Sequence, residues 1–360
     1  MSSKLLSIKV FLTVCLMCII GGGNCAWAQE TAVFTFNTKD GLTALGITAP
    51  ASGKGTNLGT NTYTVNKITM SSTDGGTPTR IWNASGSYEL RAYAGASIIF
   101  TASEGYKITQ ITFTGSYDKV TTEDSKFTKG TWTGLESSVT FNVGTKPTVK
   151  IKTATITYAK TTPITLTTAQ YGTYFTDEAF VMPEGVTGYT ITAKDGENLT
   201  LNEAYTAGTT VPASTALVLK ATDELTESKT FNAVVVNSTE VAPTDNLLHG
   251  SVDETQTNVE GAAAYYKLAN GDKGLGFYYG AENGAAFTNG AHKAYLAVAG
   301  TMSQMKGFSL DGMTTGISQV STANATNNTN IYDLNGRRIQ SLGAAQKGIY
   351  IVGGKKVIVK

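Results

Sequence analysis

The chain has 360 residues, a nearly even count of 28 basic and 27 acidic side chains, and only 15% charged residues. A chain this close to neutral lacks the broad cationic field that would attract nucleic acids or anionic membranes. Its 39 Gly and 17 Tyr are typical of β structure with frequent turns. The length suits two ordinary domains and a small further unit.

Residues 1–28 have the three parts of a secretory signal peptide. Lys4 and Lys9 give a basic start, residues 10–20 are apolar, and Ala26 and Ala28 form the small-residue cleavage site. The apolar run is short for a helix that spans a membrane, and no later run is long enough either. We therefore expect export, removal of this segment, and no transmembrane span in the mature chain.

All three cysteines, Cys15, Cys18 and Cys25, lie in this segment. A lipoprotein is an alternative interpretation, but Cys25 follows Asn24 rather than a small residue, and the other two lie inside the apolar core. Cleavage leaves a mature chain without thiols, which excludes a Cys nucleophile, disulfides and thiolate metal sites. Loss of two lysines from the 28 basic residues leaves 26 against 27 acidic residues, a net charge of −1.

Residues 29–160 are predicted to form a β-sandwich or jelly-roll-like domain. Alternating apolar residues separated by turns predict short antiparallel strands. The expected strands are 33–36, 62–70, 80–82, 88–93, 97–102, 106–114, 139–143 and 149–158. The apolar set changes parity between Ile108 and Ile111, which predicts a bulge, and it changes parity again after Ile151.

Several phrases of this domain resemble a β-sandwich module that is common in surface proteins of gut and oral bacteria. They lie at residues 91–93, 97–102, 105–113 and 130–134. The domain is also loosely similar, in architecture and aromatic content, to jelly-roll carbohydrate-binding domains. The first resemblance implies a surface location, and the second implies a carbohydrate ligand.

Residues 163–313 are predicted to form a second all-β domain. Two hairpins are expected, one at Asp195-Gly196 and one at the Gly-rich turn around Asp272, because each turn lies between apolar runs. Phrases at residues 169–175, 211–220, 246–250 and 292–296 resemble a second recurrent module of the same surface proteins. Since that module has no agreed activity, the resemblance implies an accessory or spacer domain.

Residues 314–330, rich in Thr, Asn, Ser and Ala, are predicted to be a flexible linker. Beyond the linker, apolar runs flank Asn335-Gly336 and Gly353-Gly354. Both dipeptides tolerate the positive φ angles of tight hairpin turns. Residues 331–360 are therefore expected to form a small unit of two hairpins, whose basic residues could simply protect the sheet edges from aggregation.

This tail resembles the C-terminal sorting domain of type IX secretion substrates. The matching features are YDLNGR at 332–337, GIY at 348–350 and the basic final strand. The resemblance implies recognition by the outer-membrane translocon, tail removal and attachment to anionic lipopolysaccharide, with the protein secreted or held at the cell surface. The residues it assigns to the sorting signal are Tyr332, Gly336, Gly348, Tyr350 and Lys356.

The sequence favours a protein without catalytic activity or cofactor. Neither His249 nor His292 lies near a second ligand type at metal spacing, and common catalytic motifs are absent. Asp272 could ligate Ca²⁺, although a hairpin tip explains it equally well. A glycosidase would need two carboxylates in one cleft. Four acidic residues are candidates: Asp177, Glu178, Asp253 and Glu254.

Aromatic residues of the first domain give the best prediction of a binding site. Sugar rings stack their C–H faces on indole and phenol rings, while Arg and Asn side chains bind the hydroxyl groups. We expect Trp82 and Trp132 to be exposed and Tyr93 to lie in the core. The predicted glycan-binding residues are Trp82, Tyr88, Arg91 and Trp132.

Three classes of function stay open. The protein could be an exported, non-catalytic module that binds extracellular glycan or mediates adhesion, a structural surface spacer, or a secreted glycoside hydrolase. A glycan-binding module predicts an aromatic groove on the first domain, and a spacer predicts none. An enzyme predicts a cleft with paired carboxylates.

Overall fold

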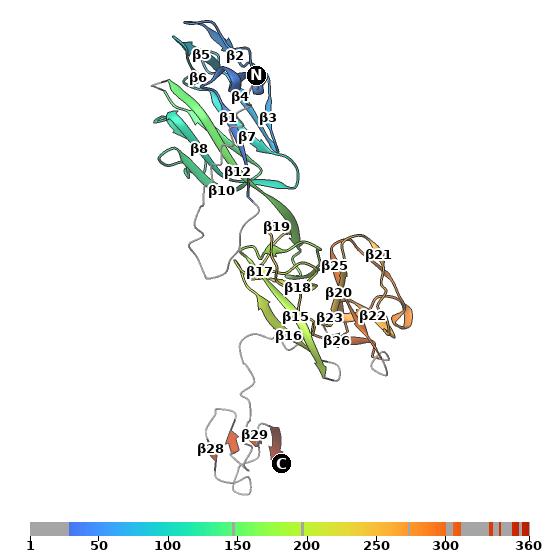
Figure 1. The fold of residues 1–360 in the computed structure, drawn as a ribbon. Coiled ribbons are helices and arrows are strands. Elements are labelled where there is room, and N and C mark those ends of the chain that lie inside the picture. Colours follow the sequence, from blue (N-terminus) through green and yellow to red (C-terminus); the bar gives the residue numbers. More distant parts are fainter. Residues whose placement is uncertain are drawn as a thin grey trace. The chain divides into compact units, whose positions relative to one another are not determined.

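The computed structural model describes residues 29–145, 148–195, 198–272, 274–299, 305–310, 331–333, 338–339, 348–352 and 355–359. These residues form an all-β protein, as predicted, and the described residues up to 310 and those from 331 belong to two separate units (Figure 1). The signal peptide with Ala26 and Ala28, and the linker 314–330, lie outside the described residues. No helix within the described ranges is long and apolar enough to cross a membrane.

The first domain is a sandwich of two antiparallel sheets. One sheet contains β1 (Glu30–Thr35), β2 (Gly55–Asn57), β5 (Arg80–Ala84), β6 (Ser87–Ala92), β8 (Tyr106–Ser116), β10 (Thr131–Glu136) and the first part of β12 (Val149–Leu166). The other has the order β3 (Tyr63–Val65), β4 (Ile68–Thr73), β7 (Ser97–Ala102), β11 (Ser138–Val143) and β9 (Val120–Thr121). Phe34 and Phe100 meet between the sheets with ring centroids 5.5 Å apart.

Both changes of apolar parity coincide with irregular strand register. Gln110 pairs with Thr157 and Ile108 with Tyr158, so Thr109 is the extra residue of a bulge, as predicted. A second shift lies between Ile151 and Thr153 of β12. Each bulge turns the following apolar residues back toward the core.

The prediction of a single strand over residues 62–70 was wrong. These residues belong to a hairpin, in which β3 and β4 pair with Val65 opposite Ile68. The turn uses Asn66 at φ 53°, a left-handed conformation that Asn tolerates better than most residues. The short helix α1 (Lys39–Ala44) was also not expected, and Thr38 caps it by accepting a hydrogen bond from the Gly41 backbone at 3.0 Å.

The second domain begins within the same strand that ends the first. Residues 161–166 of β12 pair with β19 (Lys229–Val235), which continues to β14 (Phe180–Val181) and β17 (Thr210–Val211) (Figure 1). The boundary predicted between residues 160 and 163 therefore falls inside a continuous strand rather than at a linker. Separate buried clusters still lie on either side of this point, one within residues 32–158 and two after it, within residues 164–233 and 191–310.

A nine-stranded sheet forms most of the second domain and is nearly closed. Its order is β13 (Tyr171–Tyr174), β18 (Leu217–Ala221), β15 (Val186–Asp195), β16 (Asn198–Tyr205), β26 (Gly307–Ser309), β23 (Gly274–Tyr279), β22 (Ala264–Gly271), β25 (Lys293–Val298) and β20 (Leu248–Ser251). The first strand returns toward β25, where the Ala294 backbone donates to Thr173 Oγ1 at 3.2 Å. The short strands β21 (Thr255–Gln256) and β24 (Thr288–Asn289) pair beside this sheet, and η1 (Glu282–Gly284) follows β23.

Both hairpins predicted for this domain are present. Asp195 pairs with Asn198 across the first hairpin, and the residues between them, including Gly196, lie outside the described residues. Gly271 pairs with Gly274 across the second turn, which contains Asp272. The turn residues thus predicted both hairpins.

The C-terminal unit is a four-stranded antiparallel sheet. Its order is β28 (Arg338–Ile339), β27 (Ile331–Asp333), β29 (Gly348–Val352) and β30 (Lys355–Val359). The pairs β27–β28 and β29–β30 are the two predicted hairpins, while the turn residues, including Gly336, lie outside the described residues. In register, Tyr332 lies opposite Ile351, and Ile351 lies opposite Lys356.

Candidate functional site

Trp82 and Arg91 lie on the outward face of neighbouring strands β5 and β6. Ile81 and Leu90, the residues immediately before Trp82 and Arg91, are fully buried. Because successive side chains of a strand point to opposite faces, Trp82 and Arg91 point away from this core. Both are half-buried. The structure thus brings together two of the four predicted glycan-binding residues.

Arg91 is held in place over the indole ring of Trp82. Its guanidinium carbon lies 4.8 Å from the Trp82 ring, a cation–π distance. The carboxylate of Glu89 accepts from Arg91 Nε at 2.8 Å and from Nη2 at 2.7 Å. The Glu89 side chain is 12% exposed and that of Arg91 21%, so this ion pair is largely shielded from water.

A second arginine stacks on a second ring of the same face. The guanidinium carbon of Arg80 lies 5.3 Å from the ring of Tyr93, and Arg80 Nε donates to the Pro78 carbonyl at 3.2 Å. The expectation that Tyr93 lies in the core was wrong. Tyr93 follows Arg91 by two residues and therefore shares its face, while Ala92 between them is fully buried.

Gly55 of the edge strand β2 leaves room for this arrangement. It pairs with Trp82, and a Cβ atom at Gly55 would lie 2.7 Å from Arg80 Cδ and 3.1 Å from Trp82 Cε3. Both side chains can therefore extend over the backbone of β2. We call the set Arg80, Trp82, Glu89, Arg91 and Tyr93 the aromatic–arginine face.

Tyr88 does not belong to the aromatic–arginine face. It lies opposite Asn83 on β5, and the buried side chain of Asn83 donates to the Pro50 carbonyl at 2.9 Å. Tyr88 is half-buried and packs against the core. Tyr88 therefore lies on the opposite side of the sheet from Trp82 and cannot contact a ligand that covers Trp82.

Trp132 on β10 is not exposed, contrary to the prediction. Its side chain is 1% exposed, and its indole nitrogen donates to Asp124 Oδ2 at 2.9 Å. The absent side chain of Gly134 makes room for the ring, because a Cβ there would lie 2.6 Å from Trp132 Cζ2. Burial with a satisfied N–H is the usual fate of a lone Trp in a sandwich.

A pocket of about 250 Å³ lies beside Trp132, lined by Glu123, Asp124 and Glu136 among others. Both carboxylate oxygens of Asp124 are already bound. Oδ1 accepts from Thr122 Oγ1 at 2.7 Å and from the Lys126 backbone at 3.1 Å, and Oδ2 accepts from Trp132. Asp124 therefore fixes the loop that covers the Trp132 ring.

Asp124 is expected to make folding stability depend on acid. Burial raises the pKa of this carboxyl, but hydrogen bonds from Thr122, Trp132 and the Lys126 backbone together outweigh it and lower the pKa from 3.8 to about 2. Because this pKa is lower in the folded chain than in the unfolded chain, the ionised carboxylate stabilises the fold. This stabilisation is fully present above pH 3.8 and is lost as the pH falls toward 2. Asp124→Asn should flatten this part of the profile in urea unfolding, whereas the exposed Asp118→Asn should leave it unchanged.

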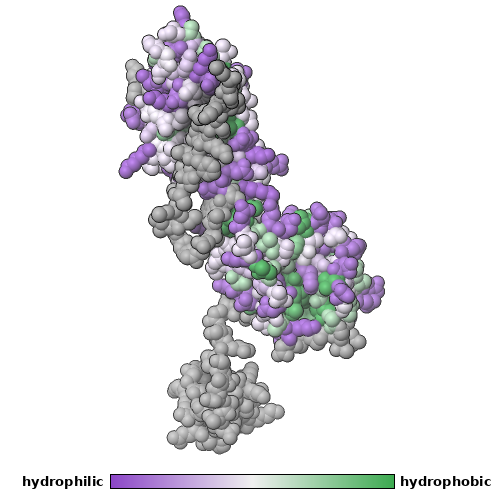
Figure 2. Space-filling view, in the orientation of Figure 1, coloured by the Kyte–Doolittle hydropathy of each residue, from purple (hydrophilic) through white to green (hydrophobic). Residues whose placement is uncertain are grey.

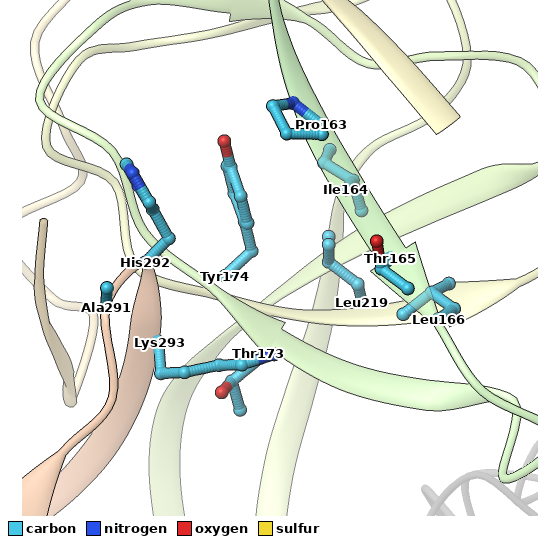
Figure 3. A pocket seen from close by; sticks show the side chains of 10 residues that line it. All are labelled: Pro163, Ile164, Thr165, Leu166, Thr173, Tyr174, Leu219, Ala291, His292 and Lys293. Atoms are coloured by element: carbon cyan, nitrogen blue, oxygen red, sulfur yellow. The ribbon is translucent and has the colours of Figure 1, made fainter. Parts of the chain in front are cut away.

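A second pocket, of about 160 Å³, lies between β12, β13 and the residues that precede β25 (Figure 3). His292 has a left-handed φ of 54°, and its ring stacks on Tyr174 with centroids 6.1 Å apart. Its Nδ1 lies 3.0 Å from the Phe175 carbonyl, which can only accept, so this nitrogen carries a proton. Ligand pockets usually measure about 300–1,000 Å³, so this pocket suits a small group rather than a sugar chain.

The acidic residues that were candidates for hydrolysis do not line either of the two pockets described above. Glu178 accepts from Lys160 Nζ at 2.7 and 2.8 Å, and neither pocket is lined by Asp177, Glu178, Asp253 or Glu254. Asp272 lies at the tip of its hairpin. Within the described ranges, no group of three or more His, Cys, Asp or Glu side chains is arranged to hold a metal ion.

No family model matches this sequence, and no curated protein or solved structure matches it. Function is therefore inferred from the residues themselves. Within the first domain, the aromatic–arginine face combines half-buried rings with fixed charged groups on an outward sheet surface. This combination can stack an apolar ring face and bind polar substituents at the same time.

Proposed function

We propose that this protein is exported to the outer surface of the cell, where it binds extracellular glycan without catalysis. The observation that carries the proposal is the pair of arginine–ring stacks, Arg91 on Trp82 and Arg80 on Tyr93, on one outward sheet face. Sugars need apolar surface for their C–H groups and fixed donors for their hydroxyl groups. This face supplies both.

The donors of Arg91 are fixed before a ligand arrives. A guanidinium group has five N–H donors, and Glu89 occupies those on Nε and Nη2 that point toward it. The Nη1 amino group is left for hydroxyl groups of a bound sugar. Because the ion pair and the ring already restrict Arg91, binding would cost little side-chain entropy.

Two features of the sequence support export. The first 28 residues have the basic start, apolar run and Ala26/Ala28 cleavage site of a signal peptide. The four-stranded sheet of the C-terminal unit fits the resemblance to type IX sorting domains. In the proposed pathway, the outer-membrane translocon binds this unit, and the protein is released or attached to anionic lipopolysaccharide.

Trp82→Ala is expected to weaken glycan binding at least tenfold. Burial of a large apolar side chain contributes about 1.5–3 kcal/mol, and about 1.4 kcal/mol corresponds to a factor of ten in affinity. Binding of the full chain to a glycan array would identify a ligand, and titration calorimetry would give the affinities. Tyr88→Phe is the matched control, because Tyr88 lies on the opposite side of the sheet.

Two results would contradict the proposal. One is an unchanged affinity for the ligand in Trp82→Ala, with circular dichroism showing that the variant is folded. The other is a wild-type protein that binds no glycan on the array, which would favour the structural spacer. Release of reducing sugar from a bound glycan would instead favour a hydrolase.

A further inference from the structure

The outward side of the first domain carries three cationic residues in one row. Arg80 on β5 pairs with Arg91 on β6, and Arg91 pairs with Lys150 on β12. Residues that pair across antiparallel strands point to the same face, and neighbouring strands lie about 4.8 Å apart. The row therefore places three positive charges side by side across three adjacent strands.

This row works against the stability of the sheet, because like charges directly opposite each other destabilise a strand pair. Glu89 is the one carboxylate of the aromatic–arginine face, and it already pairs with Arg91. Of the ion pairs formed within the described part of the chain, none includes Arg80 or Lys150. With Lys150 added, the face has three cationic groups and one anionic group.

The charge of this face is local. The whole chain has 28 basic and 27 acidic residues, so the excess here does not reflect a generally basic protein. All three cationic side chains are half-buried, so they have already lost part of their hydration. Figure 2 shows a mainly hydrophilic to neutral surface on the visible side of the first domain. A polar, anionic ligand fits these properties.

We propose that the aromatic–arginine face, extended by Lys150, binds an acidic polysaccharide with carboxylate or sulfate groups repeated along its chain. This inference rests on the proposed glycan-binding function and specifies its ligand. Arginine donates charge-assisted hydrogen bonds to carboxylates and sulfate-like oxyanions, and Arg91 keeps its Nη1 group for this contact beside Glu89. Successive acidic groups would meet Arg80, Arg91 and Lys150, while Trp82 and Tyr93 contact the sugar rings.

A nucleic acid is less well suited to this face. Nucleic-acid binding relies on a cationic surface that neutralises many phosphates along the backbone. Three cations on a nearly neutral chain supply few such contacts.

The experiment compares matched acidic and neutral polysaccharides. Polygalacturonate is paired with its fully methyl-esterified form, and dextran sulfate with dextran, and binding of each to the full chain is measured by affinity electrophoresis at low and high salt. We expect at least one acidic member to bind tenfold or more tightly than its neutral partner, with the preference reduced by salt. The two pairs distinguish a carboxylated ligand from a sulfated one.

The double variant Arg80→Gln/Lys150→Gln tests the row itself. It should lose at least tenfold in affinity for the acidic polysaccharide, a larger loss than for the neutral partner, and show a shallower dependence on salt. Lys39→Gln/Lys107→Gln removes the same charge elsewhere in the first domain and should have neither effect. Thermal unfolding would verify that both variants are folded.

The outcomes separate this inference from the function on which it rests. Binding without any preference for the acidic partner would overturn the acidic ligand and leave glycan binding in place. Failure to bind any polysaccharide would overturn both. If single-stranded DNA of equal charge competed as well as the acidic polysaccharide, a nucleic-acid ligand would replace the one proposed.

Discussion

Deletion of residues 331–360 is expected to abolish display of the protein at the cell surface. This change removes all four strands of the C-terminal sheet, β27 to β30, and with them the proposed recognition surface for the translocon. The unit that precedes it has its own buried cores, so it should fold without the tail. We therefore expect folded protein to accumulate in the periplasm, on the inner side of the outer membrane. Fractionation and surface proteolysis of the producing cells would measure this.

A length-matched replacement controls for the mere loss of chain. Residues 331–360 would be exchanged for a Gly/Ser segment of the same length, which cannot form the paired strands. This variant should fail in display as the deletion does, and single changes at Tyr350 or Lys356 should weaken display. Unchanged export and display after the deletion would show that the C-terminal sheet is not a sorting signal.

Trp132→Ala is expected to destabilise the first domain by about 3–5 kcal/mol, as for other large-to-small changes at buried aromatic residues. The change leaves a cavity where a ring that is 1% exposed now packs. It also removes the indole donor from Asp124. Urea unfolding followed by circular dichroism would measure the loss as a lower midpoint.

Trp132→Phe separates the two contributions. It keeps an aromatic ring in the core but removes the N–H group, so we expect a smaller loss of about 1–3 kcal/mol. A Trp132→Ala variant about as stable as the wild type would contradict the assignment of this ring to the core. Such a result would favour an exposed Trp132 that is available to a ligand.

Alternation along the chain predicted much of the fold, because each domain keeps one face of its strands in a core. The parity change between Ile108 and Ile111 was enough to locate the bulge at Thr109. The apolar set also changes parity between Val65 and Ile68, where Asn66 turns the chain from β3 to β4, but a parity change alone does not distinguish a turn from a bulge. Helix α1 has six residues, which is too short to show a helical period.

The site was predictable where it depends on local spacing and not where it depends on distant pairing. Trp82 and Arg91 could be grouped from their positions on neighbouring strands. The ion pair between Glu89 and Arg91 could have been predicted as well, because Glu89 lies two residues before Arg91 on the same face of the strand. Lys150 joins the row only through the register between β6 and β12, which no local pattern reveals.

The two tryptophans of the first domain, Trp82 and Trp132, also show what local sequence can and cannot predict. Both lie next to polar or small residues, so composition around them gave no reason to separate them. Trp132 lies opposite the fully buried Ile111 of β8 and therefore faces the core, and Asp124, eight positions earlier, accepts its N–H. The pairing depends on the register between β8 and β10, and the contact with Asp124 depends on the path of the intervening loop, so neither follows from the residues next to Trp132.

If the protein is attached to the cell surface, as proposed, the continuous strand β12 has a mechanical consequence. Its early residues pair with β1, β6 and β8, and its last six pair with β19. Tension between a ligand held on the first domain and an anchor beyond the second would run along this one covalent backbone. A load parallel to β12 would pull its flanking hydrogen bonds in shear, so many of them would have to break together before either domain unfolds.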